Sequence, residues 1–202
     1  MIKGADESDY QAVVIGVSSG GLKALTQILP NLPVDYPLAV IVVQHRGEVV
    51  YEVDSNTDFL VSYFQRLCKM AVKEAELGEP VCVGTIYIAP VKYHLLVEKA
   101  QYFSLSLEPP VNYSIPSIDV LFESASACYK NRLIGLILTG ANSDGSLGLK
   151  EIHRNGGLTL VQEPTTAEVD VMPKAAINSH DVNYVIPLDE IAPFMCQLAQ
   201  TE

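Results

Sequence analysis

The chain has 202 residues, of which 49% are hydrophobic and 18% charged, and its formal net charge is −11. This length suits one domain of ordinary size with a sizeable core. The negative charge argues against a nucleic-acid backbone or an anionic membrane surface as a partner, because both attract clustered Lys and Arg side chains. No apolar run approaches the roughly 18 residues that a membrane-spanning helix needs, so we expect no membrane insertion.

We divide the chain into a polar, acidic N-terminal tail at residues 1–9 and one domain at residues 10–202. The tail lacks the charged and then apolar layout of a secretory signal. The cysteines lie far apart in apolar segments and form no C-x-x-C pair; they are Cys68, Cys82, Cys128 and Cys196. We therefore expect four buried free thiols, no metal site and a cytoplasmic location.

The first predicted element is a buried strand that leads through a glycine-rich turn into an amphipathic helix. An apolar, β-branched run at residues 13–15 predicts the strand, and apolar residues at helical spacing between 22 and 29 predict the helix. Ser18 and Ser19 lie between them, where the unpaired N–H groups of a helix start can stabilise an anion.

Three interpretations compete for this turn. Residues 16–20 (GVSSG) fit the pattern G-x-S-x-G, in which a sharp turn exposes a nucleophilic serine, here Ser18. A glycine-rich turn can also hold a nucleotide pyrophosphate, but Ser18 occupies the place of the second glycine in the dinucleotide fingerprint. The third interpretation is a plain turn in which a serine caps the helix, because such caps are common.

A second buried strand is predicted at residues 38–45 and ends at His45. Residues 46–58 show little periodicity and predict an exposed loop with four acidic residues, Glu48, Glu52, Asp54 and Asp58. Asn56 or Thr57 is expected to cap the helix that follows. The apolar face of that helix is predicted to consist of Leu60, Tyr63, Phe64 and Leu67.

Between residues 71 and 107, short alternating runs predict antiparallel strands or hairpins appended to the sheet. Ser117 is then expected to cap a helix, in which Asp119 serves the helix dipole. Strands and helices alternate again in the last third, with strands at 133–139, 158–162 and 182–187 and helices near 146–154, 174–179 and 191–198. This alternation predicts an α/β fold with a doubly wound, mainly parallel sheet.

Reactive side chains follow three of these strands. In open parallel sheets, ligands bind outside the carboxyl ends of the strands. Ser18, His45 and Asp144 lie at such ends and supply the nucleophile, the general base and the orienting carboxylate of a Ser-His-Asp triad. Each has a structural alternative, since a histidine at a strand end often packs half-buried and an Asp before Gly often caps a helix.

The chain order Ser, His, Asp differs from that of the α/β-hydrolases. It resembles the catalytic domain of the chemotaxis protein-glutamate methylesterases, the CheB family. The segments that carry the resemblance cover nearly the whole chain: Ile15–Gly21, Gln44-His45, Tyr87–Pro90 with His94, Pro116–Phe122, Leu138–Gly140 with Asp144-Gly145, and Met172-Pro173.

This resemblance implies a Rossmann-like domain with an antiparallel hairpin. It implies hydrolysis of glutamate γ-methyl esters on methylated chemotaxis receptor helices to glutamate and methanol, with glutamine deamidation as a further activity of some relatives. By the same resemblance, Ser18 is the nucleophile, His45 the general base and Asp144 its orienting carboxylate. Ser19 and Ala141 then lie beside the oxyanion. A serine triad supplies both nucleophile and proton relay, so no cofactor is expected.

Two stretches depart from the family pattern. Arg46 begins the acidic loop where the family has Met-Pro-Pro, and residues 141–143 (ANS) replace Met-Gly-x. We expect the acidic loop to gate substrate choice, because like charges repel the acidic helices of ordinary receptors. The usual receiver domain does not precede the catalytic domain in this sequence, so a separate regulatory protein or a methyltransferase is a further expected partner.

Two other functions stay open at this point. The first is a non-catalytic CheB-like domain that binds a receptor or a methyltransferase. The second is a general carboxylesterase that hydrolyses small esters without any receptor. Ser18, His45 and Asp144 are all present, which favours a catalyst over a binding domain.

Overall fold

The computed structural model describes residues 10–46, 58–180 and 182–199. Its central element is a sheet in which every strand pair is parallel, in the order β3-β4-β2-β1-β7-β8-β9. Its strands are β1 Ala12–Val17, β2 Ala39–Gln44, β3 Ala71–Glu74, β4 Thr85–Ile88, β7 Leu133–Ile137, β8 Leu158–Gln162 and β9 Tyr184–Ile186. The winding reverses at β1, which lies between β2 and β7.

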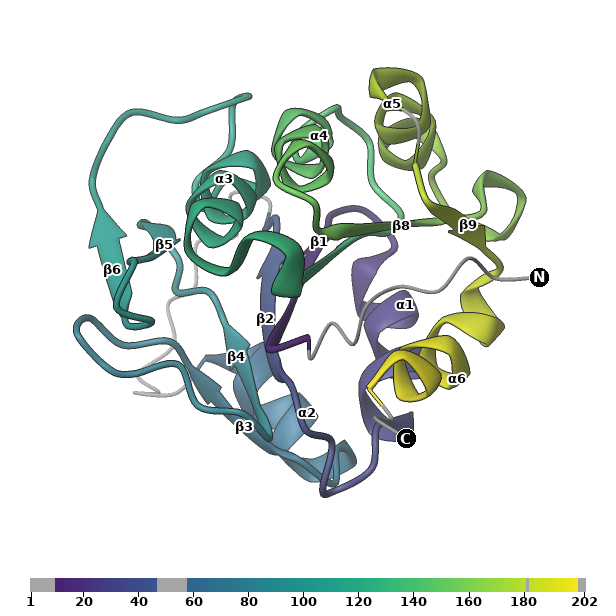
Figure 1. The fold of residues 1–202 in the computed structure, drawn as a ribbon. Helices are drawn as coiled ribbons and strands as arrows, with labels where there is room; N and C mark the ends of the chain where they lie inside the picture. The colour runs from purple at the N-terminus through teal and green to yellow at the C-terminus, as the bar shows by residue number, and fades with distance from the viewer. Residues whose placement is uncertain (1–9, 47–57, 181, 200–202) are drawn as a thin grey trace.

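Helices cover both faces of this sheet (Figure 1). One face is covered by α1 Gly21–Ile28, α2 Phe59–Leu67 and α6 Leu188–Leu198. The other face is covered by α3 Ile118–Tyr129, α4 Ser146–Arg154 and α5 Val171–Ser179. The predicted doubly wound α/β fold is therefore confirmed. Short 3₁₀ turns follow α1, α3 and β8, at Leu29–Asn31, Lys130–Arg132 and Pro164–Thr166.

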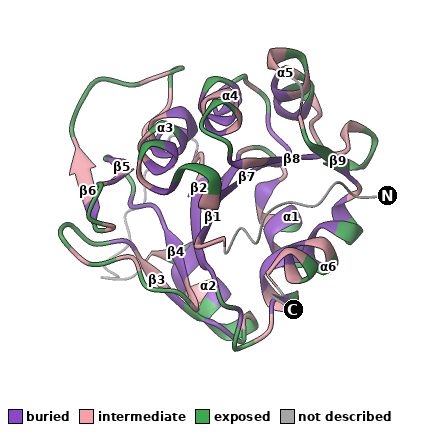
Figure 2. Cartoon of the chain, in the orientation of Figure 1, coloured by how far each residue is buried: buried purple, intermediate pink, exposed green. Residues whose placement is uncertain are grey.

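Strand β1 is buried on both sides because its side chains alternate between two cores. Val13, Ile15 and Val17 pack into the core that contains α1, α2 and α6. Ala12 and Val14 pack into the core that contains α3, α4 and α5. Burial on both faces explains the continuous apolar run of this strand. Figure 2 shows the same arrangement, with buried central strands and helices that turn their buried side toward them.

The antiparallel hairpin is a separate two-stranded sheet of β5 His94–Val97 and β6 Phe103–Ser106. The prediction that all the strands between residues 71 and 107 are antiparallel was wrong for β3 and β4. These two strands pair in parallel with each other, and β4 pairs in parallel with β2. A short alternating run shows that one face is exposed, as at the edge strand β3, but it does not encode strand direction.

The start of α2 also differs from the prediction. Asp58 is the N-cap, and its side chain accepts a hydrogen bond from Leu60 N–H at 2.8 Å, so neither Asn56 nor Thr57 is the cap. The predicted apolar face is shifted, because Val61 is buried whereas Leu67 is 43% exposed. Residues 47–57 of the predicted acidic loop lie outside the described residues.

The cysteines are free thiols, as expected, but the prediction that all four are buried was wrong. Cys82 is exposed, and Cys68, Cys128 and Cys196 are partly buried. Apolar neighbours in the sequence suggested full burial, but the segments around the cysteines pack at the margins of the two cores. Among the helices that the structure describes, none has the length and hydropathy needed to cross a membrane.

The strand register brings three strand ends to one edge of the sheet. Val17 pairs with Gln44, and Gly16 pairs with Ile137. The residues that follow these pairs therefore leave the sheet side by side. They include Ser18 after β1, His45 after β2 and the loop at residues 138–145 after β7.

Candidate active site

The turn after β1 depends on a left-handed glycine. Gly20 has a φ of +80°, and a Cβ atom there would lie 2.8 Å from the Cβ of Glu168. The turn is closed by a hydrogen bond from Gly21 N–H to the carbonyl of Ser18, at 2.9 Å. Gly20 is the N-cap residue of α1, so neither Ser18 nor Ser19 is the predicted serine cap. Ser18 is half-buried and Ser19 is exposed.

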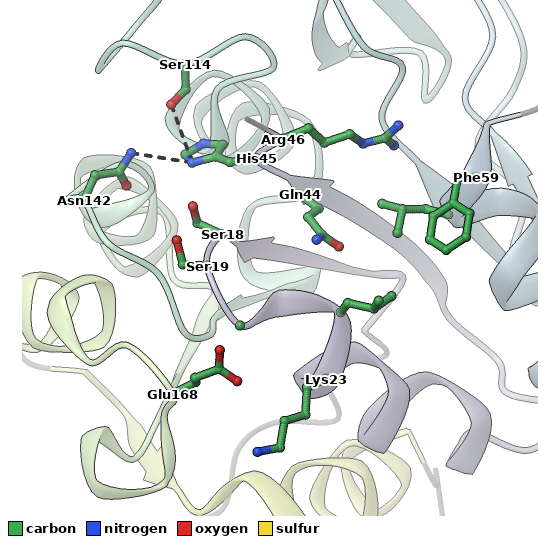
Figure 3. Close-up of a pocket in the computed structure, with 13 residues that line it drawn as sticks. Ser18, Ser19, Lys23, Gln44, His45, Arg46, Phe59, Ser114, Asn142 and Glu168 are labelled. Atoms are coloured by element: carbon green, nitrogen blue, oxygen red, sulfur yellow. Dashed lines mark hydrogen bonds between the residues drawn. The ribbon is translucent and has the colours of Figure 1, made fainter. Parts of the chain in front are cut away.

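His45 lies at the end of β2 and is oriented by Asp144. Its Nε2 is 2.7 Å from Oδ2 of Asp144, and its side chain is only 10% exposed. An ionised carboxylate can only accept hydrogen bonds, so Nε2 carries the proton and Nδ1 is the free acceptor. Ser114 Oγ and Asn142 Nδ2 each lie 3.5 Å from that Nδ1 (Figure 3).

Asp144 is fully buried and surrounded by donors. Its carboxylate accepts hydrogen bonds from His45 Nε2, Asn112 Nδ2, Ser117 Oγ and the backbone N–H groups of Ile118 and Asp119. Burial alone would raise the pKa of Asp144, but these hydrogen bonds, and the positive charge that His45 carries when it is protonated, outweigh it and lower the pKa. Asp144 therefore stays ionised as the partner of His45.

Neither the Asp144 nor the Ser117 side chain caps the helix that follows it. Asp144 precedes α4, but Gly145 is the N-cap of α4 and Asp144 instead accepts two N–H groups from the start of α3. Ser117 is the N-cap residue of α3, yet its hydroxyl donates to Asp144 at 2.9 Å. The carboxylate thus occupies the positive end of the α3 dipole, which stabilises its charge.

Ser18 and His45 line one cleft at the carboxyl edge of the sheet, with a volume of about 740 Å³. Its lining consists of Ser18, Ser19, Gly20, Leu22, Lys23, Gln44, His45, Arg46, Phe59, Leu60, Ser114, Asn142 and Glu168. In Figure 3 the hydroxyls of Ser18 and Ser19 point toward the side of the cleft where His45 lies. The hydrogen bonds of the described residues do not include one between Ser18 and His45.

The backbone around Ser18 leaves two N–H groups available beside it. Ser18 N–H donates to Thr139 at 3.0 Å, and Gly140 N–H donates to Val169 at 3.0 Å. The N–H groups of Ser19 and Ala141, the next residue after each, have no hydrogen-bond partner among the described residues. Both residues are exposed, although Ala141 is not part of the cleft lining. Free N–H groups of this kind can stabilise an oxyanion.

Ser114, Asn112 and Asn142 were not predicted from the sequence as neighbours of the His45–Asp144 pair. Asn142 could have been found from its place two residues before Asp144, whereas the 109–115 loop carries no local signal. Asp119 does not only serve the helix dipole, because its Oδ1 accepts Gly148 N–H of α4 at 2.7 Å. No group of three or more His, Cys, Asp or Glu side chains within the described residues could hold a metal ion.

The family model described as "CheB methylesterase" matches residues 13–195. A Leptospira interrogans protein, provisionally named a protein-glutamate methylesterase/protein-glutamine glutaminase, is 48% identical over 95% of this chain and 96% of its own length. A Nitrosomonas europaea protein-glutamate methylesterase/protein-glutamine glutaminase is 40% identical over 92% of this chain. The chain spans 51% of that relative, about half of its length.

A solved structure has the same fold. The crystal structure of the Thermotoga maritima CheB methylesterase catalytic domain matches with a TM-score of 0.86 and 34% sequence identity. The match covers 94% of this chain and 98% of that domain. At this identity and coverage, the likeness extends over the sheet, both helix layers and the hairpin.

Proposed function

This chain belongs to the CheB methylesterase family, which makes it a carboxylic ester hydrolase, and we propose that it demethylates glutamates of chemotaxis receptors. The γ-methyl ester is hydrolysed to glutamate and methanol. Receptor glutamine is deamidated at the same site to glutamate and ammonia, as the names of the relatives suggest for those proteins. Those names also favour an enzyme over a non-catalytic binding domain.

The proposed nucleophile is Ser18, and the proposed base is Nδ1 of His45. Because Nε2 is bound to Asp144, only Nδ1 can take the proton of the Ser18 hydroxyl. Ser18 Oγ then attacks the ester carbonyl and forms a tetrahedral intermediate. Asp144 does not take the proton, since its carboxylate is held ionised by its donors; it stabilises the imidazolium that forms.

The developing oxyanion is stabilised by the N–H groups of Ser19 and Ala141, which have no partner in the described structure. Collapse of the intermediate breaks the bond to the methoxy group, which leaves as methanol with the proton from His45. Water then attacks the acyl-enzyme, with His45 as base again, and releases glutamate and the free Ser18 hydroxyl. Amide hydrolysis follows the same steps with ammonia as the leaving group.

One observation carries this proposal: His45 Nε2 lies 2.7 Å from a buried Asp144 carboxylate, and its free nitrogen faces the cleft that Ser18 lines. Ser114 and Asn142 lie 3.5 Å from that nitrogen, at the long end of hydrogen bonding. In the proposed reaction the Ser18 hydroxyl takes their place at Nδ1. Catalytic hydrogen bonds are often loose before substrate binds.

The test combines a serine-reactive fluorophosphonate with a methylated receptor fragment. We expect covalent labelling at Ser18 and release of methanol from the receptor, and neither in Ser18→Ala. A small ester such as p-nitrophenyl acetate, without receptor, separates the receptor esterase from a general carboxylesterase by comparison of kcat/KM. Methanol release by a protein that is not labelled at Ser18 would contradict the proposed nucleophile.

A further inference from the structure

Asp119 is a second buried carboxylate directly behind Asp144. It lies in the first turn of α3 and is only 3% exposed. Its Oδ1 accepts Gly148 N–H of α4 at 2.7 Å, and its Oδ2 accepts Asn112 Nδ2 at 2.8 Å. Asp119 therefore connects α3, the start of α4 and the loop that precedes α3. The segment between β7 and α4 carries Asp144.

Asn112 links the two carboxylates. Its Nδ2 donates to Oδ2 of Asp119 at 2.8 Å and to Oδ1 of Asp144 at 3.0 Å. An amide nitrogen has two hydrogens, so both are used in this bridge. Asn112 has a φ of +50°, a left-handed conformation that Asn adopts more readily than most residues. The residue is exposed, so its side chain reaches the buried carboxylates from the surface.

The ionised form of Asp119 fits this bridge. Burial, above all, and the charges of Asp144 and Glu123 raise the pKa of Asp119 to about 6, whereas Gly148 N–H and Asn112 act in the opposite direction. An ionised carboxylate accepts both of these hydrogen bonds, whereas a proton on Oδ2 would face the Asn112 donor. The donated NH₂ group also offsets part of the repulsion between these two like charges.

We propose that Asn112 and Asp119 are positioning residues for the Asp144–His45 pair: Asp119 holds the Asn112 amide, which fixes the Asp144 carboxylate toward His45 Nε2. The inference rests on the proposed function, because it is read out through the reactivity of Ser18. Without Asn112, Asp144 keeps His45 but loses one of the three donors that hold its Oδ1 and so oppose rotation of the carboxylate. A small displacement of a base costs a large factor in rate.

The test compares Asn112→Gly and Asp119→Asn with Ser126→Ala. Glycine tolerates the φ of +50° at position 112, so the first variant removes the side chain without straining the loop. Ser126 is a matched control because it also joins α3 to α4, through a hydrogen bond from its hydroxyl to Glu151 O at 3.1 Å. Each variant is assayed for fluorophosphonate labelling of Ser18 as a function of pH, and for kcat and KM with p-nitrophenyl acetate.

We expect Asn112→Gly to lower the labelling rate and kcat about tenfold or more, with KM unchanged within about twofold. Asp119→Asn lowers both as well, because Gly148 N–H and Asn112 Nδ2 donate to separate oxygens of Asp119 and an amide keeps only one of the two. It also removes the change in the pH profile near pH 6 at which Asp119 gains its proton, because Asn does not titrate. Ser126→Ala changes neither the rate nor the profile.

If Asn112→Gly and Asp119→Asn match Ser126→Ala in rate and in pH profile, the positioning role is wrong, even though wild-type labelling supports the proposed function. If the wild-type protein is not labelled at Ser18, the proposed function fails and the inference fails with it. Should circular dichroism show that Asn112→Gly is unfolded, Asn112→Asp takes its place. That variant keeps the shape and left-handed preference, and a rate equal to that of the control again overturns the inference.

Discussion

The backbone N–H of His45 donates to the carbonyl of Val17 at 3.0 Å. This bond extends the β1–β2 ladder one step beyond the last register pair, Val17 and Gln44. The backbone of the proposed base is therefore hydrogen-bonded to the residue that immediately precedes Ser18. Because both strands are buried in the centre of the sheet, the spacing of the two backbones is set by strand pairing and not by a loop.

Ser18→Ala should abolish labelling and turnover while changing the free energy of unfolding by less than about 0.5 kcal/mol. The reason is that the Ser18 side chain neither caps α1 nor makes a hydrogen bond within the described residues. Labelling and urea unfolding of the same preparations measure the two effects. Ser19→Ala should retain most of the activity.

Ser114→Ala is the sharper control for the identity of the nucleophile. Among the described serines, Ser114 has the hydroxyl that lies within hydrogen-bonding distance of His45 Nδ1, at 3.5 Å. If Ser18 is the nucleophile, Ser114→Ala is still labelled, and mass spectrometry finds the label on the peptide that contains Ser18. A label on Ser114 in the wild-type protein would show that the proposed nucleophile is wrong.

Gly20→Ala should cost more stability than Gly78→Ala, although both positions have nearly the same φ, +80° and +79°. At either site an alanine should lower the free energy of unfolding by about 1–2 kcal/mol because of the left-handed conformation. At Gly20 the added Cβ would also lie 2.8 Å from Glu168 Cβ, whereas nothing lies within 4 Å at Gly78. The difference in unfolding free energy between the two variants measures this contact. Equal losses would mean that the turn can move away from Glu168.

The sequence predicted these strand ends well, because buried strands and glycine turns have strong local patterns. It could not predict the direction of β4, which is set by pairing with β2, about 46 residues earlier at the pair Val40 and Ile86. Nor could it predict the direction of β3, which pairs with β4. The alternative role of Asp144, as the cap of α4, was wrong for a similar reason. The Asp-Gly pair before α4 is a local cap signal, yet the carboxylate is captured by N–H groups of α3, and no local pattern reports such a tertiary contact.

Asp119 gives the unfolding free energy a pH dependence opposite in sign to that of Asp144. The pKa of Asp119 is raised from 3.8 to about 6, chiefly by burial, so the folded state binds its proton more tightly than the unfolded state. Its contribution to stability is present below the ordinary pKa and is lost as pH rises through about 6. The lowered pKa of Asp144 means that its contribution is lost as pH falls.

Subtracting the stability of Asp119→Asn from that of the wild type removes the contributions of the groups that do not interact with Asp119, because these titrate equally in both proteins. Relative to the variant, the wild type should lose up to about 3 kcal/mol of unfolding free energy as pH rises from about 4 to 7, at about 1.4 kcal/mol per pKa unit. Urea unfolding at several pH values measures it. A difference that does not vary with pH would show that Asp119 does not titrate in this range.

Cys82 should react with Ellman's reagent before the other three thiols. It is exposed, whereas Cys68 is partly buried and burial raises its pKa to about 11, which leaves little thiolate. Burial also raises the pKa of Cys128 and of Cys196. The native protein should therefore contain one equivalent of rapidly reacting thiol, and Cys82→Ser should remove it. Two or more fast equivalents would mean that the margins of the core open readily.

A test of the predicted acidic gate must keep Asp58, because Asp58 is a structural residue and not a free loop charge. Its side chain is 8% exposed, pairs with Arg46 and caps α2. Replacement of Asp58 would cost about 1 kcal/mol for the cap and would also leave Arg46 without its partner. The variant should therefore neutralise Glu48, Glu52 and Asp54 and keep Asp58.

If these three charges repel acidic receptor helices, their neutralisation should strengthen binding at low ionic strength and have little effect at about 0.15 M salt, where the Debye length is about 8 Å. The matched control neutralises Asp35, Asp189 and Glu190, which lie outside the cleft lining and are exposed, so the net charge changes equally. Binding to a receptor fragment is measured by isothermal titration calorimetry across a salt series. If the two triple variants bind with the same salt dependence, the effect comes from net charge alone, and the acidic segment has no role in substrate choice.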